Sequence, residues 1–242
     1  DLCDNWRGFL SSRDYTGHDE DLYLRALRQS DMVTVSCPAL ADLARSEGRK
    51  HGLMVIRNGG PAEPATPAAK TPPQWLTGRP TCVYCGALWG SWFDWQAVRQ
   101  AAQALAAVGG VINIIGSIAK IQPPRLPHVA YVGERPYHDA LALMAHADVG
   151  LIPFAGAEIC TYVDACKLMD YWAVRLTVAV TDPLTDAIGR PHVYAVLNER
   201  FADAIFAAAA ALKPTPEQAA QLCREHSWDA RAEQFEREVI GR

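Results

Sequence analysis

TCVYC, at residues 81–85, opens a series of short apolar runs that decides the fold. Stretches with helical spacing of apolar residues, at 95–108, 137–146 and 164–173, lie between the runs. Nearly all-apolar strands that alternate with helices are typical of parallel sheets covered on both faces, with right-handed crossover connections. The sequence therefore predicts a doubly wound α/β fold. The later runs are 111–115 (VINII), 129–132 (VAYV), 148–152 (DVGLI), 176–180 (LTVAV) and 192–197 (HVYAVL).

The residues before this series alternate helix and strand on a smaller scale. Residues 19–29 and 38–47 have helical composition, whereas 32–36 and 53–56 are short apolar strands. Residues 59–80 are rich in proline with little apolar periodicity, which is typical of a linker. We therefore predict a strand–helix–strand unit at the end of something larger at 1–58, a linker at 59–80, a doubly wound domain at 81–198 and C-terminal helices at 199–242.

Composition and charge exclude several classes of protein. The 242 residues include 23 Lys and Arg against 27 Asp and Glu, a formal net charge of −4, so no broad basic surface for nucleic acid is expected. No apolar stretch reaches the length of a membrane span and no leader-like segment opens the chain, which predicts a cytoplasmic location. Seven cysteines do not form a zinc-finger spacing, and we expect Cys82 and Cys85 to be core thiols rather than metal ligands or a redox pair.

Glycines stand where three predicted strands end. They are Gly86, Gly116 (followed by Ser117) and Gly133. Ligands of open parallel sheets bind beyond the carboxyl ends of the strands, where glycine lets backbone approach an anion. Glycine is also common in ordinary strand-to-helix turns, but three at one edge favour a ligand site. Neither a G-x-G-x-x-G run nor a P-loop lysine is present, which argues against a dinucleotide or P-loop site.

An aromatic cluster follows the first of these glycines, in the segment WGSWFDW at 89–95. Trp92 and its neighbours could form a platform for a sugar or base. The favoured interpretation is structural, with aromatic side chains docking the start of a helix that Asp94 caps.

The segment 161–170 (TYVDACKLMD) carries the most suggestive charges. If Asp164 caps a helix, Lys167 and Asp170 lie one turn apart on one face. Lys167 could then bind a diphosphate together with helix-terminal amides, and Asp170 could accept hydrogen bonds from the vicinal hydroxyls of a ribose. From spacing alone, a surface ion pair between the two side chains is the simpler interpretation.

Several segments together resemble the GT-B glycosyltransferases, specifically bacterial polysaccharide-type enzymes related to families four and one. No single segment is specific, but their order and spacing match the family across nearly the whole chain. The segments are 31–40 (DMVTVSCPAL), 55–59 (VIRNG), 84–88 (YCGAL) with 92–95 (WFDW), 114–116 (IIG), 129–133 (VAYVG) and 147–154 (ADVGLIPF).

The family's donor-binding motif is similar to residues 161–182, where Lys167 and Tyr171 match its lysine and tyrosine. Asp170 stands in place of a glutamate, Arg175 in place of a turn glycine and Thr177 in place of a proline. The resemblance implies a donor site for a nucleoside-diphosphate sugar with no obligate metal or other cofactor; its catalytic residues are unknown. The residues it implicates are Gly86, Trp92, Asp94, Gly116, Ser117, Gly133, Thr161, Lys167 and Asp170.

The implied reaction is glycosyl transfer to a polysaccharide or lipid-linked glycan, at the inner face of the membrane if the acceptor is lipid-linked. Residues 1–58 resemble only the last part of the family's acceptor-side domain, and residues 1–9 resemble a mid-domain segment. Because closure between two domains excludes water and positions the acceptor, we expect this chain alone to transfer sugar poorly. The alternative hypothesis is a non-catalytic module that binds a nucleotide or a partner chain.

Overall fold

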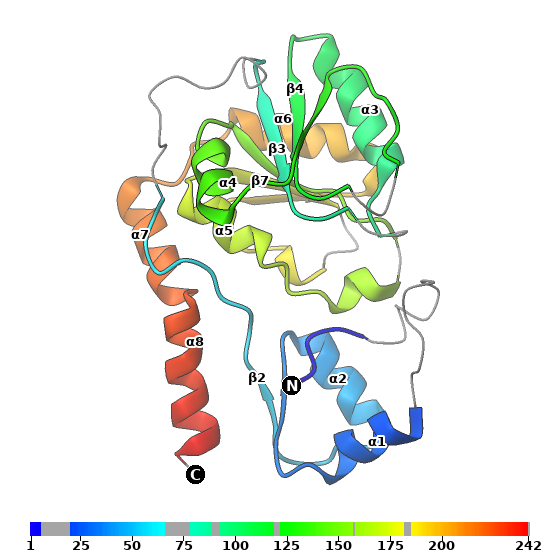
Figure 1. Ribbon diagram of the computed structural model, residues 1–242, viewed down its shortest axis with the longest axis vertical. Helices are drawn as coiled ribbons and strands as arrows, with labels where there is room; N and C mark the ends of the chain where they lie inside the picture. Colours follow the sequence, from blue (N-terminus) through cyan, green and yellow to red (C-terminus); the bar gives the residue numbers. More distant parts are fainter. Residues whose placement is uncertain are drawn as a thin grey trace.

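The computed structural model describes residues 1–5, 20–65, 78–88, 92–118, 122–156, 158–181 and 185–241, and it contains two parallel sheets (Figure 1). The small sheet has two strands near the N-terminus, and the large sheet has six. Each sheet has its own cluster of buried apolar side chains. The architecture is the predicted α/β fold.

The small unit consists of α1 (Glu20–Gln29), β1 (Val33–Val35), α2 (Pro38–Ser46) and β2 (Leu53–Val55). All four elements lie where the sequence pattern places them, and β1 pairs with β2 in parallel. Leu2 extends this sheet, since its amide donates to the Thr34 carbonyl at 2.7 Å. The apolar faces of the helices close the core, which includes Leu27, Val33, Val35, Cys37, Leu40, Ala41 and Ala44.

The large sheet has the strand order β5-β4-β3-β6-β7-β8, with every pair parallel. The chain runs outward from β3 to β5, returns to the middle at β6, and then runs outward the other way. The order therefore reverses between β3 and β6, the usual ligand position in doubly wound sheets. The strands are β3 (Thr81–Cys85), β4 (Val111–Ile115), β5 (Val129–Gly133), β6 (Val149–Ile152), β7 (Thr177–Thr181) and β8 (Val193–Val196), each within one residue of the predicted boundaries.

Helices cover both faces of this sheet (Figure 1). On one face, α3 (Trp95–Ala106) packs against α6 (Phe201–Ala210). On the other, α4 (Tyr137–Met144) contacts β3 and α5 (Lys167–Ala173) contacts β7. Short 3₁₀ turns also follow three strands: η3 (Glu158–Tyr162) after β6, η4 (Thr185–Ala187) after β7 and η5 (Asn198–Arg200) after β8.

The C-terminal helices return along the connector between the two sheets. α7 (Pro216–Glu225) begins with a capping box at Thr215, and α8 (Trp228–Phe235) continues into a π-helical turn, η6 (Glu236–Ile240). Gly60 of the connector exchanges backbone hydrogen bonds with this region, donating to His226 at 2.9 Å and accepting from Trp228 at 3.1 Å. Figure 1 shows α8 running beside the chain that leads out of β2.

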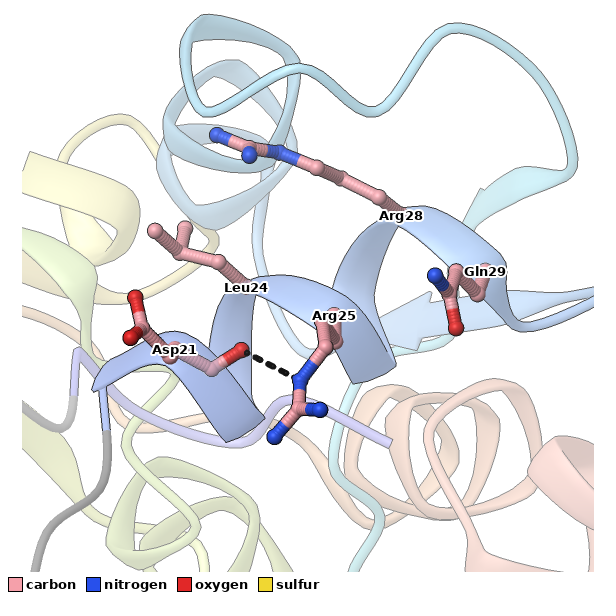
Figure 2. A pocket seen from close by; sticks show the side chains of 5 residues that line it. All are labelled: Asp21, Leu24, Arg25, Arg28 and Gln29. Carbon is pink, nitrogen blue, oxygen red and sulfur yellow. Dashed lines mark hydrogen bonds between the residues drawn. The ribbon is translucent and has the colours of Figure 1, made fainter.

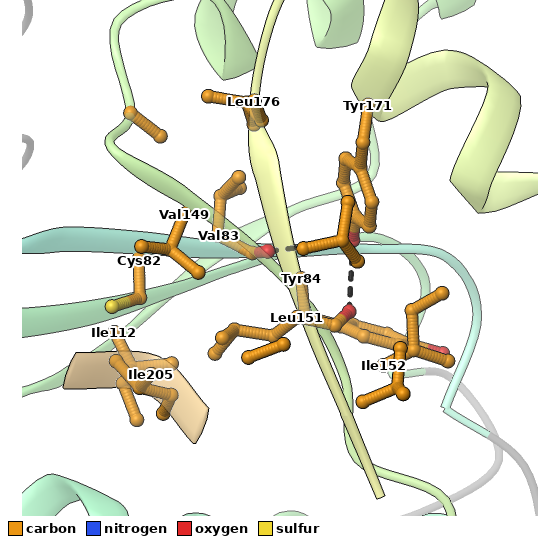
Figure 3. Close-up of a cluster of buried hydrophobic side chains, with 14 of the residues drawn as sticks. Cys82, Val83, Tyr84, Ile112, Val149, Leu151, Ile152, Tyr171, Leu176 and Ile205 are labelled. Carbon is orange, nitrogen blue, oxygen red and sulfur yellow. Dashed lines mark hydrogen bonds between the residues drawn. The ribbon is translucent and has the colours of Figure 1, made fainter. Parts of the chain in front are cut away.

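Tyr171 ties α5 to the middle of the large sheet (Figure 3). Its hydroxyl accepts from the Cys85 amide at 3.1 Å and donates to the Leu151 carbonyl at 3.0 Å. A Cβ on Gly150 would lie 2.6 Å from the Tyr171 ring, so β6 needs glycine beneath it. This packing fixes α5, and with it Lys167 and Asp170, over the carboxyl half of β3 and β6.

Candidate functional site

The three predicted glycines meet at the carboxyl edge of the sheet. The Gly86 amide donates to Ile115 at 2.9 Å, and the Gly116 amide donates to Gly133 at 3.1 Å. Gly86 and Gly116 have φ angles of 147° and 149°, and a Cβ on Gly116 would lie 2.1 Å from the Gly86 carbonyl oxygen. Close approach of two strand ends therefore requires glycine here.

Lys167, the first residue of α5, reaches this edge from above. A Cβ on Gly86 would lie 2.6 Å from its Cε, which places the lysine stem directly on the glycine. The ammonium group lies 5.5 Å from the centre of the Tyr84 ring and 5.6 Å from that of Phe154. Tyr84 belongs to β3 and Phe154 follows β6, so the ammonium stands over the point where the strand order reverses.

The Lys167 ammonium has no counter-charge. Across the described residues it makes no ion pair within 4.0 Å and no hydrogen bond, and its side chain is half-buried. Burial lowers the pKa of Lys167, while the neighbouring Cys166, Cys85 and Asp170 oppose that shift. Cation–π contacts with two rings supply only part of the lost hydration. The Lys167 ammonium is thus a half-buried cation flanked by two aromatic rings.

Asp170 is not the partner of Lys167, so the surface ion pair expected from spacing is wrong for the described structure. Its Oδ1 instead accepts a hydrogen bond from the Tyr137 hydroxyl at 2.7 Å. Burial raises the pKa of Asp170, and the Tyr137 hydrogen bond and Lys167 oppose that shift. Tyr137 was not among the predicted site residues. The signal that could have found it is its place at the start of the helix that follows Gly133, at the same sheet edge.

Trp92 and Asp94 have mainly structural contacts. Trp92 stacks on Phe154, with ring centres 5.7 Å apart, and Phe154 in turn lies beneath Lys167. Asp94 caps α3, since its Oδ1 accepts from the Ala97 amide at 2.8 Å, while its Oδ2 accepts from Asn198 at 2.5 Å. The capping prediction is confirmed, and both oxygens of Asp94 are already used. Trp89, Gly90 and Ser91 of the aromatic segment lie outside the described residues.

Ser117 and Thr161 lie at the margins of the site. The Ser117 carbonyl accepts from the Leu88 amide at 3.1 Å, which keeps it beside the end of β3. Thr161 lies in η3, which packs on α2 and η4 rather than on the glycine edge. Within the described structure, no hydrogen bond links Thr161 to Lys167 or to the glycines. Donor binding by these two residues stays a prediction.

Asp164 does not cap α5, and that prediction is wrong. The helix begins at Lys167 with Cys166 as its N-cap residue, and no side chain caps it. Asp164 is almost fully buried two residues earlier, where its Oδ2 accepts from the Asn58 amide at 2.7 Å. The Asn58 side chain donates to the Asp164 carbonyl at 2.8 Å. The Asp164 carboxylate therefore accepts from Asn58, which is distant in the sequence, and not from an amide of the helix that follows it.

Asp164 belongs to an ionic cluster that we define as Arg57, Asp164, Asp186 and Arg190. Arg190 pairs with Asp164 at 2.9 Å and also with Asp186, and Arg57 pairs with Asp186 at 2.5 Å and with Asp164 at 3.5 Å. Burial raises the pKa of Asp164 despite the arginines. For Asp186 the arginines outweigh burial and lower the pKa. The cluster joins the connector to the loops before α5 and after β7.

A surface hollow of about 450 Å³ lies along α1 (Figure 2). It is lined by Asp21, Leu24, Arg25, Arg28 and Gln29, all on one helix. Arg25 donates to the Asp21 carbonyl at 3.3 Å and Arg28 to the Glu47 carbonyl at 2.8 Å. Both arginines already satisfy backbone carbonyls, and the hollow has no counterpart among the predicted site residues.

All seven cysteines are free, Cys82 is fully buried in the core and Cys85 partly so, as predicted, and burial raises the pKa of both thiols, that of Cys85 to about 11. Over the described ranges, no group of three or more His, Cys, Asp or Glu side chains is placed to hold a metal ion. Nor does any described helix have both the length and the apolar character needed to span a bilayer.

The fold is that of the GT-B glycosyltransferases. No protein-family model matches the sequence, and no curated protein matches it significantly. Sucrose-phosphate synthase from Thermosynechococcus elongatus aligns with a TM-score of 0.63 at 18% identity, over 96% of this chain and 64% of that one. Trehalose 6-phosphate synthase from Burkholderia multivorans gives 0.69 at 11% identity, over 91% and 61%. Anabaena HepE, solved with UDP-glucose, gives 0.65 at 14% identity, over 93% and 69%.

This chain spans less than two thirds of the length of the first two of these enzymes. At such identities the likeness establishes the fold and leaves substrates and activity to be argued from the residues.

Proposed function

We propose that this protein binds a nucleoside-diphosphate sugar at the carboxyl edge of the large sheet and takes part in glycosyl transfer from it. The observation that carries the proposal is the Lys167 ammonium, which stands over the reversal of strand order with no counter-charge within 4.0 Å in the described structure. The GT-B fold supports it, as does a neighbour of that fold solved with UDP-glucose.

The chemistry follows from the charges. A diphosphate beside Lys167 would form charge-assisted hydrogen bonds with the ammonium. Departure of the diphosphate leaves negative charge on its oxygens, and a half-buried ammonium would stabilise that charge without a metal ion. Lys167 would thus assist the bond cleavage, and Asp170 would hold the ribose.

For the acceptor we propose a hydroxyl of a polysaccharide or lipid-linked glycan, which for a lipid-linked acceptor brings the protein to the inner face of the membrane. Acceptor-binding groups and a catalytic base would come from the acceptor-side domain. Because the chain spans less than two thirds of sucrose-phosphate synthase, efficient transfer is proposed for this site together with a full acceptor-side domain.

Thermal unfolding with a panel of UDP, GDP and ADP sugars tests the donor site. A ligand at 100 times its dissociation constant stabilises the folded state by about 2.7 kcal/mol. We expect one base to give this shift and Lys167→Met to abolish most of it. Equal behaviour of wild type and Lys167→Met, or no shift with any nucleotide, would favour a module that binds a partner chain instead.

A further inference from the structure

Tyr137 occupies an unusual position for a large aromatic residue. It is the first residue of α4, four residues after β5 ends at Gly133, and 51% of its surface is exposed. Its hydroxyl nevertheless points to α5, where it donates to Asp170 Oδ1 at 2.7 Å. Its ring contacts His138 edge-on, with ring centres 5.6 Å apart. An exposed side chain therefore links the start of α4 to α5, the helix that begins at Lys167.

This hydrogen bond leaves two acceptors on one surface. The phenol uses its only proton on Asp170, so the lone pairs of its oxygen stay available. In the described structure Asp170 Oδ2 accepts no hydrogen bond, whereas Oδ1 accepts the one from Tyr137. The two available acceptors belong to hydrogen-bonded groups and therefore lie a few ångströms apart. Two neighbouring acceptors match the two hydroxyl donors of a cis-diol.

The positions of Asp170 and Tyr137 also fit a ligand whose phosphates bind at Lys167. Lys167 and Asp170 stand one turn apart on α5, so a diphosphate at the ammonium would bring the adjoining sugar toward Asp170. The Asp170 carboxylate is carried on a single methylene, and Tyr137 adds a polar atom beyond it. A nucleoside diphosphate presents ribose hydroxyls next to its phosphates.

We propose that Tyr137 is a specificity-determining residue, which with Asp170 forms a two-acceptor site for the ribose 2′,3′-cis-diol of the donor nucleotide. This inference rests on the proposed function, since it names how the same site distinguishes ribonucleotides from their deoxy counterparts. In this arrangement the Tyr137 oxygen accepts from the 2′-hydroxyl and Asp170 accepts from the 3′-hydroxyl.

Titration calorimetry on the full chain tests this with three ligands: the nucleoside diphosphate that binds best among UDP, GDP and ADP, its 2′-deoxy form, and inorganic pyrophosphate. Tyr137→Phe keeps the ring and removes the oxygen. We expect affinity for the ribonucleotide to fall about three- to tenfold, in keeping with one hydrogen bond. Affinities for the 2′-deoxy form and for pyrophosphate should stay within about twofold.

Tyr131→Phe is the matched control. Its hydroxyl also makes one hydrogen bond, to the Pro124 carbonyl at 2.6 Å, but from within β5 and away from Asp170. It should leave all three affinities unchanged.

Two results would overturn the inference while leaving the donor site intact: an equal loss for all three ligands in Tyr137→Phe, which indicates a structural role, or wild-type protein that binds ribo and 2′-deoxy forms equally. Wild-type protein that binds neither nucleotide nor pyrophosphate would overturn the proposed function and this inference together.

Discussion

Two groups of charges lie near the carboxyl edge of the large sheet and differ in how they are neutralised. In the ionic cluster of Arg57, Asp164, Asp186 and Arg190, every charge has an opposite charge within hydrogen-bond distance. At the other group, the Lys167 ammonium faces two aromatic rings and no carboxylate within 4.0 Å, as far as the described residues go.

The difference separates structural charges from ligand-binding ones. A buried ion pair offsets its desolvation cost internally, and breaking it leaves an uncompensated charge. A half-buried cation without a counter-charge keeps a desolvation cost that a bound anion can offset, and perturbed, unpaired groups concentrate at functional sites. Substitutions in the cluster should therefore reduce stability, and substitution of Lys167 should reduce anion binding.

The largest effect is expected from breaking the cluster. Asp164→Ala leaves Arg190 without one of its two carboxylates and removes the acceptor of the Asn58 amide. We expect a loss of about 3–5 kcal/mol in the free energy of unfolding, measured by urea denaturation. Asp42→Ala is the control, because Asp42 pairs with Arg45 on an exposed helix surface and should cost under about 1 kcal/mol. A comparable loss of unfolding free energy in Asp164→Ala and Asp42→Ala would contradict the structural role of the ionic cluster.

Lys167→Met should weaken anion binding without reducing stability. Affinity for pyrophosphate is expected to fall about ten- to a hundredfold, the range for one charge-assisted hydrogen bond, by titration calorimetry. The free energy of unfolding should not fall, since a poorly solvated charge is replaced by an apolar chain of similar length.

Lys213→Met serves as its control. That ammonium donates to the Ala147 carbonyl at 2.7 Å, just before β6 and so at the other end of the strands. Unchanged pyrophosphate affinity in Lys167→Met, or an equal loss in Lys213→Met, would remove Lys167 from the anion site.

The charge of Lys167 also makes stability depend on pH. Because the pKa of Lys167 is lowered in the folded state, the folded protein binds fewer protons than the unfolded chain between that lowered value and 10.5. Stability therefore rises with pH across this window, by at most about 1.4 kcal/mol per pH unit. As the pH approaches 10.5, the free energy of unfolding of the wild type should rise relative to that of Lys167→Met. A flat difference would indicate a normally hydrated lysine.

The smallest effect concerns Arg175, which has a φ of 61° where the resemblance places glycine. Its guanidinium donates to the Pro214 carbonyl at 2.8 Å, so Arg175→Ala and Arg175→Gly lose the same hydrogen bond. Only alanine retains the left-handed strain, and Arg175→Gly should therefore be the more stable of the two, by about 0.5–1 kcal/mol in urea denaturation. Equal stability would mean that the backbone relaxes at this turn.

The sequence by itself determined the strands and helices of the large sheet and the edge at which its strands end. Apolar runs such as 111–115 and amphipathic stretches such as 95–108 identify strands and helices because side-chain periodicity is a local property. Parallel order then follows from right-handed crossovers, so the meeting of Gly86, Gly116 and Gly133 at one edge could be expected without coordinates. The domain boundaries drawn from the proline-rich segment stay a prediction.

Only the tertiary structure decided which charges are paired. Asp164 looked like a helix cap from its position in the chain, but its partners are Asn58 and Arg190, which come from distant segments. The same holds for Asp170, whose partner Tyr137 lies 33 residues away rather than one helical turn away at Lys167. Spacing along the sequence identifies neighbours on one helix, whereas the cost of burying a charge depends on every chain segment packed around it. That environment, and with it the contrast between the ionic cluster and Lys167, exists only in the folded chain.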